Sequence, residues 1–187
     1  MMDFPQLTTE RLVLRAVTER DAPALYEIFS DPAVMRFWSR PPMESIEEAI
    51  ALVREIESGW NARTLLQWGI TSKGEGAVIG TCTLYRWDRT HRRAELGYVL
   101  RRERWGAGIA TEAVRAVLDH AFGTMNLHRI GADTDPRNAA SARLLERLGF
   151  SREGLQRETY FHLGEWADSE LWGLVEPVPD TKSPSAF

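Results

Sequence analysis

The chain has 187 residues, of which 43% are hydrophobic, and a formal net charge of −4 at pH 7. This length supports one well-buried core and is too short for two ordinary domains. The acidic balance argues against a protein that holds nucleic acid over a broad surface.

The amino-terminal part is predicted to hold one strand and two helices. Alternating apolar residues predict the strand over 7–17. Apolar residues at helical spacing predict one helix around 24–29, ended by Asp31-Pro32, and a second from Ile46, ended by Gly59. Between them, residues 34–42 contain two adjacent prolines and are expected to be irregular. Their aromatic residues either pack on the core or form one wall of a binding site, and we expect that wall to include Phe37 and Trp38.

The middle and the end of the chain switch between strand and helix periods. Strands predicted over 66–71, 78–87 and 94–100 suit an antiparallel meander. A helix then begins at Ile109 with Glu112 on its outer face, a buried strand covers 128–133, a helix capped by Asn138 ends at Gly149, and two strands cover 150–157 and 166–175. This order predicts a single α+β domain over 1–175, followed by a mobile tail over 176–187.

Two glycines precede the helix that begins at Ile109, and they suggest an anion site. Gly106 and Gly108 let the backbone approach a ligand closely, and the first NH groups of a helix converge on one point of partial positive charge. A phosphate or pyrophosphate suits such a turn. A tight connection without a ligand is the alternative.

Other residue types exclude several kinds of site. The single cysteine, Cys82, excludes an internal disulfide and is read as a buried filler, while the four histidines have no metal-ligand spacing. We therefore expect no metal. No apolar run approaches the ~20 residues that cross a bilayer, and the amino terminus lacks the zones of a signal peptide, so a cytoplasmic protein without membrane contact is expected.

Two separate motifs, residues 105–110 and residues 138–150, resemble the GNAT acetyltransferases, in particular the branch similar to the RimJ/RimL ribosomal-protein N-terminal acetyltransferases. Residues 105–110 match the acetyl-CoA loop of that family, with Trp105 in place of the usual Gln or Arg. Residues 138–150 match a second motif of the branch, and Thr9-Glu10-Arg11-Leu12 matches its typical opening. Residues 165–171 resemble its ending, so the likeness extends to about Val175.

The resemblance implies the GNAT fold, a mixed and mostly antiparallel sheet splayed at its middle and flanked by helices, and acetyl-CoA as cosubstrate. A bulge within 95–100 would part that strand from the strand over 128–133. Pantetheine would then bind the exposed backbone groups of the first strand, and pyrophosphate the NH groups of the glycine turn. Arg101, Arg102 and Arg104 are placed to meet the remaining phosphate charge. The expected cofactor-binding residues are Tyr98, Val99, Leu100, Arg101, Trp105, Gly106, Ala107, Gly108, Ile109, Ala110, Thr111, Asn138 and Ser141.

Acetyl transfer requires that an amine lose a proton, attack the thioester and expel a thiolate. The resemblance implies Glu95 as the base, and Ser141 is a candidate proton donor to the sulfur. Tyr98 and Tyr160 are weaker candidates, and Tyr160 and Glu95 are also expected to contact the acceptor. The structural alternatives are a strand-edge carboxylate for Glu95, and capping or packing for Ser141.

Two other functions compete with the enzyme. A non-catalytic acyl-CoA or nucleotide binding module would keep the glycine turn but would not need Glu95. A nucleic-acid binder would use the seven arginines within residues 86–104, against the net negative charge. Within the enzyme reading, the acceptor amine could belong to a protein amino terminus, a free amino acid, a polyamine or an antibiotic, and a homodimer is left open.

Overall fold

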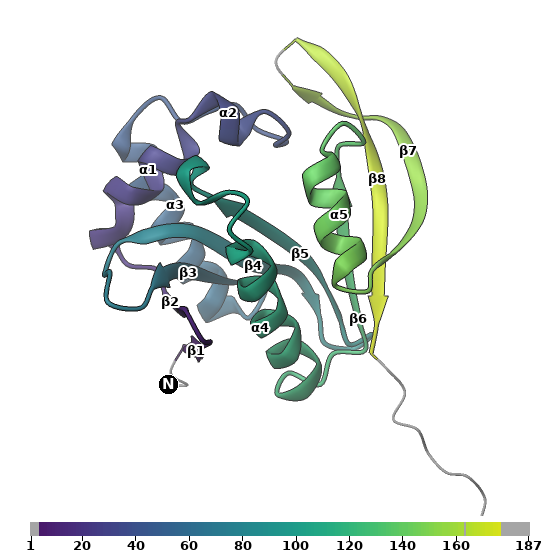
Figure 1. Cartoon of the computed structure of the whole chain (residues 1–187), viewed down its shortest axis with the longest axis horizontal. Coiled ribbons are helices and arrows are strands. Elements are labelled where there is room, and N and C mark those ends of the chain that lie inside the picture. The colour runs from purple at the N-terminus through teal and green to yellow at the C-terminus, as the bar shows by residue number, and fades with distance from the viewer. Residues whose placement is uncertain (1–3, 163, 177–187) are drawn as a thin grey trace, which may run out of the picture.

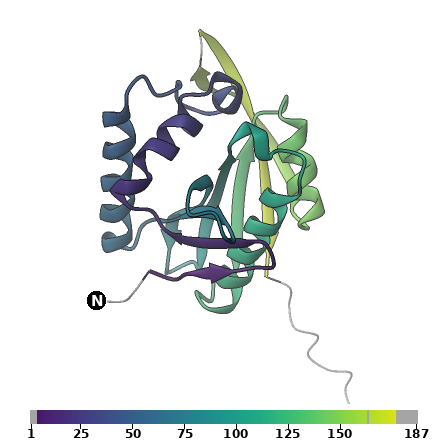
Figure 2. The same cartoon turned by 60° about the vertical axis from the view of Figure 1, so that its left-hand side comes forward.

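The computed structural model describes residues 4–162 and 164–176. These residues form one eight-stranded sheet with helices on both faces (Figures 1 and 2). The strands are β1 (Leu7–Thr8), β2 (Leu12–Ala16), β3 (Leu66–Ser72), β4 (Val78–Asp88), β5 (Arg93–Leu100), β6 (Arg129–Thr134), β7 (Ser151–His162) and β8 (Glu165–Val175). The α-helices are α1 (Ala22–Phe29), α2 (Pro32–Met35), α3 (Ile46–Ala62), α4 (Ile109–Gly123) and α5 (Ala139–Arg147), and 3₁₀ turns cover Glu19–Asp21 and Arg102–Arg104.

The sheet is mixed and mostly antiparallel, and it opens in its middle, which confirms the predicted fold class. Its strand order is β1-β2-β3-β4-β5-β6-β8-β7, and β5 and β6 form the parallel pair. These two strands pair only where Arg93–Glu95 faces Arg129–Gly131, and Figure 1 shows them diverging beyond that contact. The expectation of a bulge within 95–100 is wrong, because β5 pairs with β4 in regular register from Glu95 to Leu100. The gap instead begins where the parallel pairing ends.

Two apolar clusters hold the helices on opposite faces of the sheet. On one face α4 and α5 cover a cluster that includes Trp68, Cys82 and Leu96, and on the other α1 and α3 pack around Val78 and Val99. Figure 2 shows the two helix pairs on either side of the sheet. Cys82 is fully buried, as predicted. Because alternate residues of a strand point to opposite faces, β4 and β5 each contribute to both clusters.

Three features of the amino-terminal part differ from the sequence prediction. The strand over 7–17 is two short strands, β1 and β2, which pair with each other. The segment 34–42 is irregular except at its start, which belongs to α2. Gly59 does not end α3, which continues to Ala62. A Cβ at Gly59 would lie 2.8 Å from the Cβ of Leu65, so the glycine permits close packing and the helix ends at the left-handed Arg63 instead.

The closing strands are longer than predicted, because the pairing of β7 with β8 extends the first of them to His162. Glu176, the first residue of the predicted tail, is held by a hydrogen bond from its NH to the carbonyl of His128. Residues 177–187 lie outside the described residues. Among the helices that the structure describes, none has the length and apolar character to cross a membrane.

Candidate functional site

The glycine turn opens α4 in the predicted way. Gly106 and Gly108 have φ angles of 74° and 75°, which favour glycine because a Cβ would be strained there. The first intrahelical bond is donated by the NH of Glu112 to the carbonyl of Gly108. The NH groups of residues 109–111 therefore have no acceptor within the helix. A Cβ at Gly106 would meet nothing within 4 Å, so a ligand can approach the turn there.

The glycine turn is fixed from a distant part of the chain. Arg11 donates from Nη1 to the carbonyl of Ala107 at 3.0 Å and from Nε to Glu112 Oε2 at 2.6 Å. Thr9 Oγ1 donates to the other Glu112 oxygen, also at 2.6 Å. The prediction that Glu112 faces outward is wrong, because its carboxylate accepts hydrogen bonds from Thr9 and Arg11 in the turn between β1 and β2. This network lowers the pKa of Glu112 against the opposing effect of burial.

The edge of β5 presents free backbone groups to the gap. The NH of Arg101 donates to the carbonyl of Ile79. By this register, the backbone NH and C=O groups of the odd-numbered residues of β5 bond to β4, and those of the even-numbered residues point toward the gap. Tyr98 and Leu100 therefore face the gap, whereas the backbone groups of Val99 are turned to β4. The Leu100 carbonyl accepts a bond from Trp105 Nε1 at 2.9 Å, which ties the turn after β5 to the strand end.

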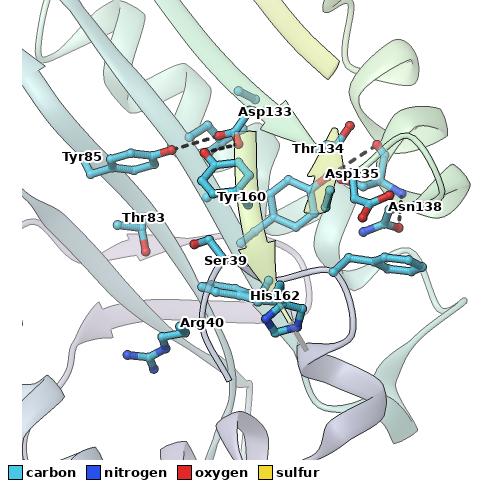
Figure 3. Close-up of a pocket in the computed structure, with 18 of the residues that line it drawn as sticks. Ser39, Arg40, Thr83, Tyr85, Asp133, Thr134, Asp135, Asn138, Tyr160 and His162 are labelled. Carbon is cyan, nitrogen blue, oxygen red and sulfur yellow. Dashed lines mark hydrogen bonds between the residues drawn. The ribbon is translucent and has the colours of Figure 1, made fainter. Parts of the chain in front are cut away.

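A cavity of about 530 Å³ joins the two faces of the sheet through this gap. On the side of α5 it is lined by Tyr98, Asn138 and Ser141, and on the opposite face by Thr83 and Tyr85. Figure 3 shows the labelled members of this lining. One compartment can therefore hold a ligand that enters from the α5 side and a second ligand that enters from the other face.

Two hydroxyls meet on the α5 side. Asn138 caps α5 as predicted, since its side-chain oxygen accepts from the NH of Ser141 at 3.2 Å. Ser141 Oγ lies 2.6 Å from the hydroxyl of Tyr98. Burial raises the pKa of Tyr98 to about 12, so the phenol stays protonated at neutral pH and the pair holds protons that it can donate.

Two carboxylates lie near each other on the opposite face. Glu95 stands beside Tyr85 in the strand register and its carboxylate lies over Gly131. Burial raises the pKa of Glu95, and the charge of Asp133 raises it further. Asp133, which the sequence analysis missed, accepts hydrogen bonds from the hydroxyls of Tyr85 and Tyr160 (Figure 3). Its position at the end of a buried strand beside the gap was the available signal.

Three of the four residues predicted to contact the acceptor lie at the cavity, and the fourth, Glu95, is not among the residues that line it. Phe37, Trp38 and Tyr160 all line the cavity, and Trp38 also packs edge-on against Phe29 with ring centroids 5.5 Å apart. Arg40 and His162 line it too and were not predicted. Both are ordinary polar residues in sequence, and only the fold brings them to the cavity.

Comparison with known proteins identifies the family of this chain. A model of the acetyltransferase (GNAT) domain matches residues 11–151. The chain belongs to the GNAT acetyltransferase family. The uncharacterized N-acetyltransferase YoaA of Bacillus subtilis is 36% identical to it over 174 residues, which cover 93% of this chain and 98% of that protein.

Two further relatives extend the likeness of this GNAT chain. The ribosomal protein uS5-alanine N-acetyltransferase of Escherichia coli is 30% identical over 184 residues, covering 92% of this chain and 91% of that one. The structure of Mycobacterium smegmatis RimJ in complex with CoA-disulfide matches with a TM-score of 0.82 at 26% identity, covering 91% of this chain and 86% of that one.

Acetyl-CoA is the cosubstrate of this GNAT chain, and the residues present fit it. The glycine turn suits a pyrophosphate, and the free edge of β5 suits the amides of pantetheine. Of the three arginines predicted near the phosphates, Arg101 is paired with Glu27 and Arg104 with Glu75, whereas Arg102 makes no ion pair within the described ranges. No group of three or more potential metal ligands lies together among the residues described in the structure.

Proposed function

We propose that this chain transfers an acetyl group from acetyl-CoA to a primary amine by direct attack within a ternary complex. The observation that carries the proposal is the cavity that runs through the gap between β5 and β6. It brings a cosubstrate on the side of α4 and α5 within reach of an acceptor on the other face. Positioning of this kind supplies a large part of the acceleration in bimolecular reactions.

The two faces supply the two proton transfers. Glu95, with its raised pKa, accepts a proton from the amine, directly or through water. The neutral amine attacks the thioester carbonyl, forming the C–N bond, the nitrogen releases its surplus proton to solvent, and collapse of the tetrahedral intermediate breaks the C–S bond. The hydroxyl pair of Ser141 and Tyr98 donates a proton to the departing thiolate. The products are an acetylated amine and free CoA.

The test is release of free CoA thiol in the presence of a panel of amines, with wild type and Glu95→Gln compared across pH. We expect amine-dependent thiol release in the wild type, and a loss of roughly 10²-fold to 10⁴-fold in kcat in the variant. The wild-type rate should fall as pH drops through the pKa of Glu95, and the variant should lack this acidic limb. Tight acetyl-CoA binding without transfer to any amine would favour a binding module.

A further inference from the structure

The acidic groups of the cavity already have partners. Asp133 accepts from the hydroxyls of Tyr85 and Tyr160 at 3.3 and 2.9 Å, and from Ser169 at 3.3 Å. Asp135 is ion-paired with Arg137 at 2.6 Å. The Asp168 carboxylate accepts from the NH of Glu158 at 2.9 Å. Each of these three carboxylates therefore already has a hydrogen-bonding or ionic partner and does not need a cation from a ligand.

The opposite is true of the one guanidinium that lines the cavity from the segment 36–42. Arg40 makes no hydrogen bond or ion pair with any residue that the structure describes, and its Nε and Nη2 atoms are also shielded from solvent. Its guanidinium lies 4.9 Å from the centre of the Phe29 ring. Arg40 is half-buried, and two shielded donors without a hydrogen-bonding partner are costly; this desolvation lowers the pKa of Arg40 against the opposing charges of Glu55 and Glu48.

The two unpaired nitrogens have a specific chemistry. Nε and Nη2 form one edge of the guanidinium, and this edge binds the two oxygens of a carboxylate side by side. His162 Nε2 is a second shielded nitrogen on the same cavity that has no partner among the described residues. Figure 3 shows Arg40 at the far end of the cavity from Asp133, with Thr83 and Ser39 between them.

From this pattern we infer that the acceptor is a primary amine that also carries a carboxylate, which Arg40 binds through its Nε and Nη2 edge. The inference rests on the proposed acetyl transfer and names the acceptor class. The amine lies toward Glu95, which makes no hydrogen bond among the described residues. The floor between the two ends is open, because a Cβ at Gly97 would meet only Tyr85, at 3.7 Å.

Binding requires a rotation of the Arg40 side chain, since its free edge is closed to solvent. The rotation exchanges two unpaired buried donors for two charge-assisted hydrogen bonds, so the ligand favours it. A polyamine gains nothing comparable here. Its second ammonium would meet the charge of Arg40 and carboxylates that are already bonded.

The experiment compares each acid with its own amide. Free L-amino acids and short ω-amino acids are tested as acceptors beside the corresponding carboxamides, which keep the amine and lose the negative charge, and beside spermidine. For the best acceptor we expect kcat/KM to be at least about 10-fold higher for the acid than for the amide. In Arg40→Met this preference should fall to near one, while the KM for acetyl-CoA stays unchanged.

Arg36→Met is the matched control. Arg36 belongs to the same segment and stacks on Phe37 at 5.0 Å, but it is exposed and does not line the cavity. This variant should keep the wild-type preference for the acid. The comparison of acid with amide in the wild type needs no variant, so it stands even if Arg40→Met folds poorly.

The outcomes separate the two claims. Amides or spermidine acetylated as fast as the acids would overturn the acceptor class and leave acetyl transfer intact. An unchanged acid preference in folded Arg40→Met would overturn the assignment to Arg40. Failure to acetylate every amine in the panel would overturn the proposed function and this inference with it.

Discussion

Adding one methyl group at Gly131 tests whether the position of Glu95 matters, without altering its charge. A Cβ at Gly131 would stand 2.7 Å from Glu95 Oε1 and 2.8 Å from its Cδ. Glu95 Oε2 stands closer still, so the carboxylate must retreat by about 1 Å to reach an ordinary contact of 3.4 Å. Misplacement of a reacting group by about 1 Å can cost 10²-fold in rate. We therefore expect Gly131→Ala to lower kcat by roughly 10-fold to 100-fold, which is about 1.4 to 2.7 kcal/mol in the activation barrier.

The neighbouring strand offers a matched control. Gly173 pairs with Gly131, and a Cβ there would stand 2.6 Å from the Cδ of Glu153 and 2.5 Å from Nη2 of Arg129. Gly173→Ala thus crowds Glu153, a glutamate with no proposed part in the reaction, together with its ion-pair partner Arg129. Initial rates of thiol release with saturating acetyl-CoA and acceptor give kcat for both variants, and thermal melting reports their stability. If Gly131→Ala and Gly173→Ala both fold and have the same kcat, the role of Glu95 is refuted.

Three further predictions concern other parts of the chain. Gly108→Glu should abolish acetyl-CoA binding by calorimetry while circular dichroism stays native, because it adds bulk and negative charge at the glycine turn; unchanged affinity would contradict that assignment. Trp38→Ala should raise the KM of the acceptor more than that of acetyl-CoA, and equal effects would indicate core packing instead. Burial alone would raise the pKa of Asp21, but hydrogen bonds from Arg15 and Thr18 outweigh it and lower that pKa. Asp21→Asn should therefore cost about 1–3 kcal/mol of unfolding free energy near pH 7, measured by urea titration, and this difference should vanish as pH falls through the folded-state pKa; a pH-independent difference would exclude the ion pair as its source.

Local sequence signals were reliable wherever a few neighbouring residues decide the conformation. The periods of α3, α4 and the strands β3 to β5 follow from apolar spacing, and these elements form as predicted. Asn138 caps α5 through a bond to a residue only three positions away. The errors lie where distant packing intervenes, as at Gly59, which allows contact with Leu65 rather than ending its helix.

The sequence by itself therefore determined the kinds of elements, the glycine turn and the family to which they belong. Only the tertiary structure decided which side chains share the cavity. Tyr98 meets Ser141 across 43 positions of sequence, and Arg11 meets Glu112 across 101. Such pairs depend on strand register and on the divergence of β5 from β6, and both arise from packing of the whole sheet. The unpaired edge of Arg40 is likewise a property of the folded cavity, because the fold decides which groups lie within hydrogen-bonding distance of the guanidinium.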